Sequence, residues 1–164
     1  MHTNLRWEKG LFSKTYKIYS NNQLVGNLVD KAFSQSSSGQ LDGRGYTFRT
    51  KGTFKQHTEI LDNKDNKVIG EITYNGWMTK ATLSVLGKTI SWKYDNIWNS
   101  KWSIFDKDGI RIKYSGSSKS GKIESSTDDA LLLLFGLFVT NYYRQMFIVI
   151  IVAVFIPIWV SVLQ

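Results

Sequence analysis

The chain has 164 residues and a formal net charge of +8, a length that allows one domain with a core and an additional segment. It contains no cysteine, which excludes disulfide bonds, cysteine-ligated zinc and thiol catalysis. The excess of positive charge favours an anionic partner, either lipid headgroups or nucleic acid, while a solvated basic surface is the simpler interpretation.

From Leu5 to Ser126 the pattern predicts β structure. Runs of β-branched and aromatic residues alternate with polar residues, and Asn, Asp, Gly and Ser mark the turns. Counting the runs gives about eleven or twelve strands. Three hairpin-like segments, YKIYSNNQLVGNLVD, TEILDNKDNKVIGEITYN and WSIFDKDGIRIKYS, indicate a weak internal repeat. The Ser- and Gly-rich stretch from Ser34 to Gly45 is predicted to be a mobile loop between strands.

The pattern changes at Ser126. The sequence Ser126-Thr-Asp-Asp129 fits a helix capping box, and the run from Ala130 to Val139 has no polar face, so this helix must be buried on all sides. Through Thr140 it rises only about 16 Å, which is too short to span a bilayer. Barrels of about eleven strands can enclose a helix. We therefore predict that residues 1–127 form a closed antiparallel β-barrel around a central hydrophobic helix at residues 128–143.

A second apolar segment follows. Residues 146–164 carry no charged side chain. As a helix, the eighteen residues from Met146 to Leu163 rise about 27 Å, close to the roughly 30 Å hydrocarbon core of a bilayer. This predicts a C-terminal transmembrane helix. Tyr142, Tyr143 and Trp159 are predicted membrane-interface anchors, because amphipathic rings favour headgroup depth. No Lys or Arg follows Arg144, so the positive-inside rule predicts a single-pass protein with its N-terminal domain in the cytoplasm.

The three hairpins and the capped helix TDDALLLLFGLFVTN resemble the tubby C-terminal-like superfamily, which includes tubby proteins, phospholipid scramblases and plant LURP-one-related proteins. The resemblance is architectural and covers about residues 5–143. It implies a closed barrel that encloses a hydrophobic C-terminal helix. Tubby domains bind phosphoinositides, but no matching headgroup motif is found here. Scramblases are described with a calcium-binding segment, whereas the acidic turns at 62–66 and 106–109 have too few ligands for such a loop and are interpreted as hairpin turns.

No catalytic or metal site is predicted, and no cofactor is expected. His2 and His57 lack a second histidine at metal-ligand spacing, and neither a nucleophile elbow nor a phosphate loop is present. The tryptophans between residues 77 and 102 lie among lysines, a composition found at nucleic-acid and membrane interfaces. Strand alternation places Trp92 in the core, whereas Trp98 follows a turn and is expected to be more exposed.

The leading interpretation is a non-enzymatic, membrane-anchored barrel that contacts anionic lipid headgroups. Lys119, Lys122 and Arg144 are the candidate lipid-binding residues, because they lie near the membrane segment in the sequence and each contributes about 1 kcal/mol on an anionic leaflet. Lipid translocation of the scramblase kind and a scaffold role with membrane-protein partners are the alternatives. The membrane segment favours lipid over nucleic acid. An outer-membrane barrel is not favoured, because no export signal is found and both faces of many predicted strands carry charge.

Overall fold

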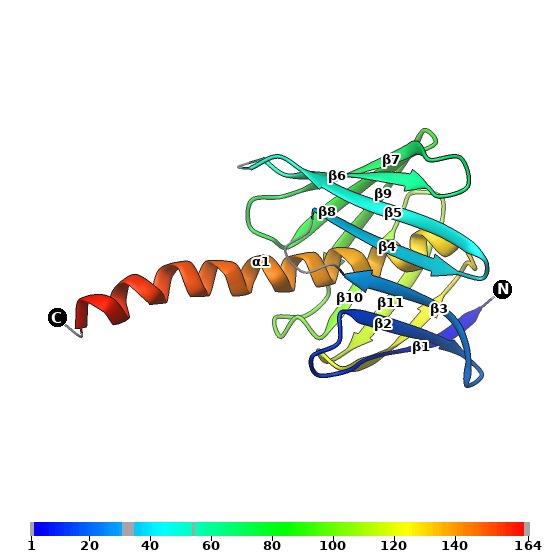
Figure 1. The fold of residues 1–164 in the computed structure, drawn as a ribbon. Coiled ribbons are helices and arrows are strands. Elements are labelled where there is room, and N and C mark those ends of the chain that lie inside the picture. The colour runs from blue at the N-terminus through cyan, green and yellow to red at the C-terminus, as the bar shows by residue number, and fades with distance from the viewer. Residues whose placement is uncertain (1, 31–34, 54, 163–164) are drawn as a thin grey trace.

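A computed structural model describes residues 2–30, 35–53 and 55–162 of the chain. In this part of the chain, twelve strands form a closed antiparallel barrel around one helix, α1 (Ala130–Val162) (Figure 1). The strands are β1 (Thr3–Lys9), β2 (Thr15–Ser20), β3 (Gln23–Asp30), β4 (Ser36–Leu41), β5 (Arg44–Lys51), β6 (His57–Asp62), β7 (Lys67–Tyr74), β8 (Lys80–Val85), β9 (Lys88–Tyr94), β10 (Lys101–Phe105), β11 (Arg111–Gly116) and β12 (Ser120–Ser125). The predicted fold class is confirmed.

Each strand pairs with its neighbours along the chain, and β1 pairs with β12 to close the barrel. This last pairing extends from Thr3 opposite Ser125 to Glu8 opposite Ser120. Alternate residues of a strand point inward, and most of the inward residues are apolar and form one buried cluster with α1. Closure of the barrel therefore leaves no unpaired edge strand, and the helix fills the interior of the barrel.

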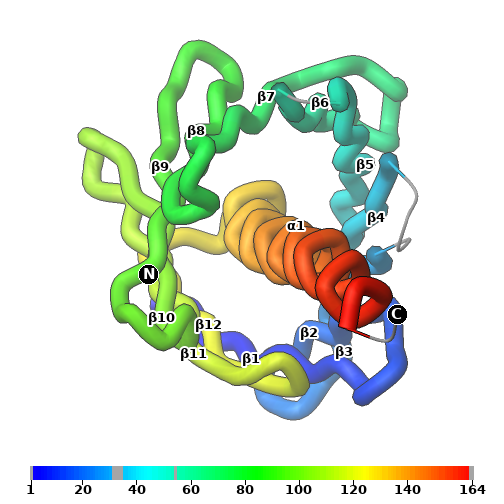
Figure 2. Tube along the Cα trace, turned by 90° about the vertical axis from the view of Figure 1, so that its left-hand side faces the viewer, coloured from blue at the N-terminus to red at the C-terminus, as the bar shows by residue number. Residues whose placement is uncertain are grey.

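The two ends of the barrel differ in their connections. We call the end where β12 leads into α1 the far end, and the end where α1 leaves the barrel the exit end (Figures 1 and 2). Two-residue turns join β2–β3, β4–β5 and β8–β9 at the far end, and both residues of each turn have positive φ, as type I′ hairpins require. The far end also has longer connections, at 63–66 and 106–110, and the connections at 10–14, 75–79, 95–100 and 117–119 on the exit end all exceed two residues. Among the connections that the structure describes in full, the two-residue turns therefore all lie at the far end.

The residue that caps the N-terminus of α1 is not the predicted one. Oδ1 of Asp129 accepts a hydrogen bond from the Leu132 amide (3.1 Å), so Asp129 is the N-cap and its carboxylate lies at the positive end of the helix dipole. The Ser126 hydroxyl, predicted to cap the helix, accepts instead from the amide of Arg111 (2.9 Å). Pairing of β12 extends to Ser125, so Ser126 still belongs to the strand side of the junction.

α1 is one continuous helix of 33 residues. The central helix predicted at 128–143 and the anchor predicted at 146–164 are therefore two parts of one element, and residues 163–164 lie outside the described residues. Neither glycine nor proline stands at 144–145 to end the helix. The part up to Tyr143 is enclosed by the barrel, whereas the part from Phe147 to Val162 is exposed.

Directional contacts at Gly136 fix α1 within the barrel. The Gly136 carbonyl accepts hydrogen bonds from the indole N–H groups of Trp92 (3.3 Å) and Trp102 (3.1 Å). The Tyr114 hydroxyl donates to two carbonyls of the preceding turn, both at 3.1 Å. A Cβ atom at Gly136 would overlap the Tyr114 ring, so glycine is required at this helix position. The predicted core location of Trp92 is confirmed.

Two of the three hairpins predicted as repeats share a β-bulge. The register of β2–β3 shifts after Ile18, which pairs with Gly26, and the register of β6–β7 shifts after Ile60, which pairs with Gly70. A Cβ atom at either glycine would collide with a backbone carbonyl of the next strand. Glycine therefore allows the next strand to approach closely beside each bulge. The third hairpin, β10–β11, pairs without a shift.

The stretch from Ser34 to Gly45, predicted as a mobile loop, forms β4 and the start of β5; Ser34 itself lies outside the described residues. Close packing explains why this stretch contains small residues. α1 passes close to β4, and a Cβ atom at Gly39 would lie 3.1 Å from the Leu134 side chain. The composition that suggested a loop reflects close contact between helix and strand.

Candidate membrane-facing site

The exit end is the place where α1 becomes uncovered. From Phe147 to Val162 its residues are exposed and none is charged, and this bare segment rises about 24 Å at 1.5 Å per residue. α1 is long and apolar enough to cross a membrane. A continuous exposed apolar surface of this extent marks an interaction site for a membrane or for protein.

A buried polar cluster attaches α1 to the mouth of the barrel, its opening at the exit end. Asn141 donates from Nδ2 to Oδ2 of Asp30 (2.8 Å) and accepts at Oδ1 from the Tyr16 hydroxyl (2.8 Å) and from Nζ of Lys9 (3.4 Å). Asp30 and Asn141 are both buried. Because the buried polar side chains find partners in one another, as buried polar groups require, we interpret the cluster as the attachment of α1 to β1, β2 and β3.

Burial also shifts the pKa values of two side chains in this cluster. It raises the pKa of the Tyr16 hydroxyl to about 12, so this group stays a neutral hydrogen-bond donor at physiological pH. Burial lowers the pKa of Lys9, and the nearby carboxylate of Asp30 opposes that effect. A carboxylate beside a partly buried ammonium is the expected way to keep such a charge inside a protein.

Arg144, one of the predicted lipid-binding residues, marks the level at which α1 leaves the protein. Its guanidinium donates to the Ser117 carbonyl (3.2 Å) and lies 5.5 Å from the centre of the Trp102 ring. The neighbouring Gln145 amide donates to Asp30. Arg144 is half-buried, and the contact with Ser117 brings it to the β11–β12 connection.

The three predicted interface anchors lie in two different places. Tyr143 is 3% exposed and its hydroxyl donates to the Lys80 carbonyl. Tyr142 stacks on Tyr74 with ring centres 4.2 Å apart. Both rings therefore contact protein inside the mouth at the last covered turn of α1, and lipid contact by them stays a prediction. Trp159 is exposed near the end of the bare segment.

Lys119 and Lys122, the other predicted lipid-binding residues, are both exposed. Lys119 lies in the β11–β12 connection, two residues from Ser117, so the structure brings it to the same side of the mouth as Arg144. Lys122 lies within β12, where it pairs with Ser115. It is thus on the outer wall of the barrel and not at the mouth.

The connections around the mouth expose large apolar side chains. Phe12 in β1–β2 is 93% exposed, and Trp77 in β7–β8 and Trp98 in β9–β10 are 85% and 81% exposed. Leu11 and Ile97 adjoin them and are exposed as well. We call these five residues the apolar rim. The connections that carry them lie at the end of the barrel from which the bare helix emerges (Figure 2), so the exposed apolar side chains of the rim and of the helix lie at one end of the molecule.

Charge is distributed unevenly between the two ends. Lysines adjoin the rim at positions 14, 80, 101 and 119. At the far end, the aspartates at positions 42, 65, 106, 108, 128 and 129 are accompanied by basic residues at positions 44, 64, 67, 88, 107 and 111, so the charges there nearly balance. An anionic surface is therefore attracted more strongly to the exit end than to the far end.

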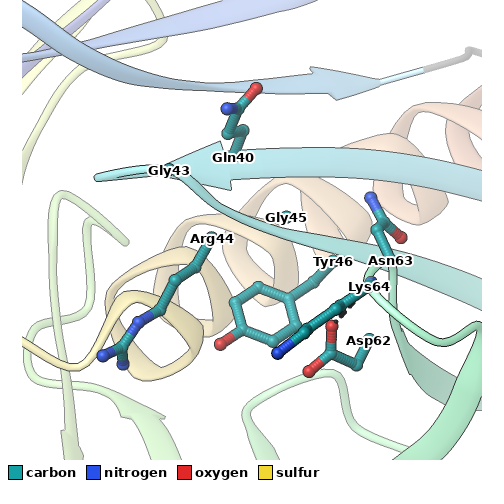
Figure 3. A pocket seen from close by; sticks show the side chains of 8 residues that line it. All are labelled: Gln40, Gly43, Arg44, Gly45, Tyr46, Asp62, Asn63 and Lys64. Carbon is teal, nitrogen blue, oxygen red and sulfur yellow. Dashed lines mark hydrogen bonds between the residues drawn. The ribbon is translucent and has the colours of Figure 1, made fainter.

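A polar hollow of about 740 Å³ lies at the far end, between the β4–β5 and β6–β7 turns. Figure 3 shows Arg44, Tyr46, Asp62, Asn63 and Lys64 around it. Asp62 accepts a hydrogen bond from the Lys64 amide (2.9 Å), so its carboxylate helps to form the turn. The hollow lies on the end opposite the bare helix and is separate from the candidate membrane-facing site.

Comparison with protein-family models, with curated proteins and with solved structures finds no match to this chain. Within the described ranges, no three His, Asp or Glu side chains are grouped so that they could bind a metal ion. Inference about function therefore rests on the geometry of the exit end.

Only part of this site was predicted from the sequence. The predicted exposure of Trp98 is confirmed. Trp77 was included among the tryptophans of an interface-like composition without a prediction of its exposure, and Phe12 was not predicted to belong to the site. One signal for Trp77 was present: the spacing Asn-x-Trp-x-Ser/Thr-Lys occurs at residues 75–80 and again at residues 96–101.

Proposed function

We propose that this protein is a non-enzymatic, membrane-anchored barrel whose exit end faces an anionic membrane surface. The observation that carries the proposal is the division of α1, which is covered by the barrel as far as Tyr143 and is bare and apolar from Phe147 onward. No linker separates the two parts. A bilayer around the bare part therefore brings the mouth of the barrel to the membrane surface.

Anionic headgroups are the proposed lipid contact. Arg144 contacts the β11–β12 connection, which also carries Lys119, and further lysines lie in or beside the other connections at the exit end. Each basic residue near an anionic leaflet contributes about 1 kcal/mol of binding. The same residues favour a barrel on the cytoplasmic side under the positive-inside rule.

The proposal includes a place in the tubby C-terminal-like superfamily. A closed antiparallel barrel around a hydrophobic C-terminal helix supports it. The superfamily relation adds no residue roles to the proposal, because no headgroup motif is carried over. The lipid contact depends on the charge and position of the residues at the exit end alone.

A lipid-dependence experiment tests the headgroup contact. Ser118→Cys introduces the sole thiol into this cysteine-free chain, and an environment-sensitive fluorophore there reports on the β11–β12 connection of the full chain in liposomes. We expect the emission to shift to the blue when anionic lipid is included, and salt to reverse the shift. The charge reversals Lys14→Glu and Lys119→Glu, both in connections at the exit end, are together expected to weaken the response.

The matched control carries Lys64→Glu and Lys107→Glu at the far end, and we expect it to respond like the parent chain. Emission that is the same with and without anionic lipid, at every salt concentration, would count against the headgroup contact.

A further inference from the structure

The β7–β8 and β9–β10 connections are two copies of one loop. Both have the pattern Asn-x-Trp-x-Ser/Thr-Lys, at residues 75–80 and 96–101. The fourth residue of each copy has a left-handed backbone, with φ of 55° at Met78 and 54° at Asn99. Its amide donates to the carbonyl of the first asparagine, at 3.2 Å in both copies. We call these two connections the tryptophan loops.

The asparagine side chain closes each tryptophan loop from within. In the first loop, Oδ1 of Asn75 accepts hydrogen bonds from the amides of Thr79 and Lys80, both at 2.9 Å. In the second loop, Oδ1 of Asn96 accepts from the two amides at the same spacing, at 3.0 and 3.1 Å. The asparagine Nδ2 donates to the Ser/Thr hydroxyl in both loops, at 2.9 and 2.8 Å. The loops are therefore held in shape by their own side chains.

The third residue of each loop is a tryptophan that projects into solvent. Trp77 and Trp98 are among the most exposed large side chains, whereas Trp92 and Trp102 of the neighbouring strands are buried in the core. An exposed indole forgoes the hydrophobic stabilisation that burial would give, and the closed loops hold it away from the barrel wall. The rings are thus preorganised to contact something outside this chain.

We propose that the tryptophan loops are interfacial anchors, which place Trp77 and Trp98 at headgroup depth in a lipid bilayer while Lys80 and Lys101 contact headgroup phosphates. The inference rests on the proposed membrane attachment and adds a second attachment made by the barrel itself. Indole rings favour the membrane–water interface, since they combine an apolar body with one N–H donor, and lysine reaches from that depth to the phosphates.

One observation favours a bilayer over a protein as the occupant of this surface. The Tyr143 hydroxyl donates to the Lys80 carbonyl, so the first loop is bonded to α1 at the turn where the helix loses its cover. The bare apolar segment begins four residues later, at Phe147. A bilayer that covers this segment therefore comes next to the loop.

Fluorine NMR of the full chain tests the inference. The chain is labelled with 5-fluorotryptophan and placed in nanodiscs of anionic lipid, and its signals are assigned by single Trp→Phe variants. Line broadening is then compared for a lipid with a nitroxide headgroup and for a water-soluble gadolinium chelate. Leu86→Trp is the matched control, because Leu86 lies in an exposed turn at the far end.

We expect the lipid nitroxide to broaden the signals of Trp77 and Trp98 and the chelate to broaden the signal at Leu86→Trp. Loop signals that behave like the Leu86→Trp signal, while Trp159 is broadened by lipid, would overturn the loop anchors and leave the helix anchor standing. Loop signals protected from both reagents would indicate a protein occupant and would equally overturn the inference. Absence of lipid broadening at Trp159 and the loops alike would contradict the proposed membrane attachment itself.

Hydrogen–deuterium exchange of a double variant supplies a second test. Trp77→Ser with Trp98→Ser keeps the asparagine bonds that close the loops, so the loops keep their shape. We expect deuterium uptake by the loop amides in nanodiscs to rise in this variant, while Leu86→Ser leaves it unchanged. Equal uptake in the parent chain and the double variant would contradict insertion of the rings.

Discussion

Gly136 determines how α1 fits into the barrel. Alanine in its place would gain about 1 kcal/mol of helix propensity, but its Cβ would overlap the buried ring of Tyr114, and overpacking costs about 1–3 kcal/mol or more. We expect Gly136→Ala to lower the free energy of unfolding in detergent by about 2 kcal/mol. Gly76→Ala is the matched control, since a Cβ there meets no atom. Equal stability of the two variants would contradict the proposed contact.

Tyr16 is expected to make the barrel sensitive to alkaline pH. Burial raises the pKa of its hydroxyl from an ordinary value of 10 to about 12 in the folded state. The folded state thus holds this proton more tightly, and the resulting stabilisation is complete below pH 10 and is lost as the pH rises through about 12. At about 1.4 kcal/mol per pKa unit, the loss of stability approaches about 3 kcal/mol.

Chemical unfolding between pH 10 and 12 measures this effect. Phenylalanine has no proton to lose, so the free energy of unfolding of Tyr16→Phe is expected to fall less steeply with pH than that of the parent chain. The two curves are compared by slope and not by absolute value, because the variant also loses the hydrogen bond to Asn141. Parallel slopes would show that Tyr16 does not carry the pH dependence.

Among the elements, the bulged hairpins depend on Gly26 and Gly70. We expect Gly26→Ala and Gly70→Ala each to lower the free energy of unfolding by about 1–3 kcal/mol, because a backbone carbonyl cannot move aside as a side chain can. Gly26→Ala is expected to be the more destabilising. A Cβ at Gly70 would lie 2.8 Å from the Ser84 carbonyl, and a Cβ at Gly26 would lie closer to that of Gln40. Denaturant unfolding measures which variant loses more stability, and a larger loss for Gly70→Ala would contradict this explanation.

The strands and the enclosed helix could be predicted because their signals are local. Alternation along a strand and the missing polar face between Ala130 and Val139 are visible within short windows of sequence. The need to bury that helix then predicts the barrel, since the chain offers enough strands to surround it. The repeated hairpins were likewise visible, and Gly26 and Gly70 recur at the bulges.

The features that the sequence did not predict depend on contacts between distant residues. Gly39 appears in a loop-like composition, but its small size serves a neighbour 95 positions away, Leu134. The pairing of β12 as far as Ser125 moves the helix cap from Ser126 to Asp129. The apolar rim becomes a single surface only when the barrel closes and gathers its connections at the exit end.

At the scale of the whole molecule, one helix runs without a linker from the interior of the barrel to a segment that the barrel does not cover. The part within the barrel is held by the Gly136 contacts and by the Asn141 cluster at the mouth. The bare part emerges between exposed aromatic rings and lysines. The proposed attachment predicts a defined orientation of the barrel on a membrane, because tilting it would withdraw part of the rim from the surface.

Backbone NMR of the unmodified chain in nanodiscs, with lipids that carry a nitroxide on the acyl chain, measures both environments at once. We expect the amide signals from Phe147 to Val162 to be broadened and those from Leu131 to Val139 to remain sharp, because the barrel shields the latter. Broadening of the Leu131–Val139 signals, or sharp signals throughout Phe147–Val162, would contradict a helix divided between barrel and bilayer.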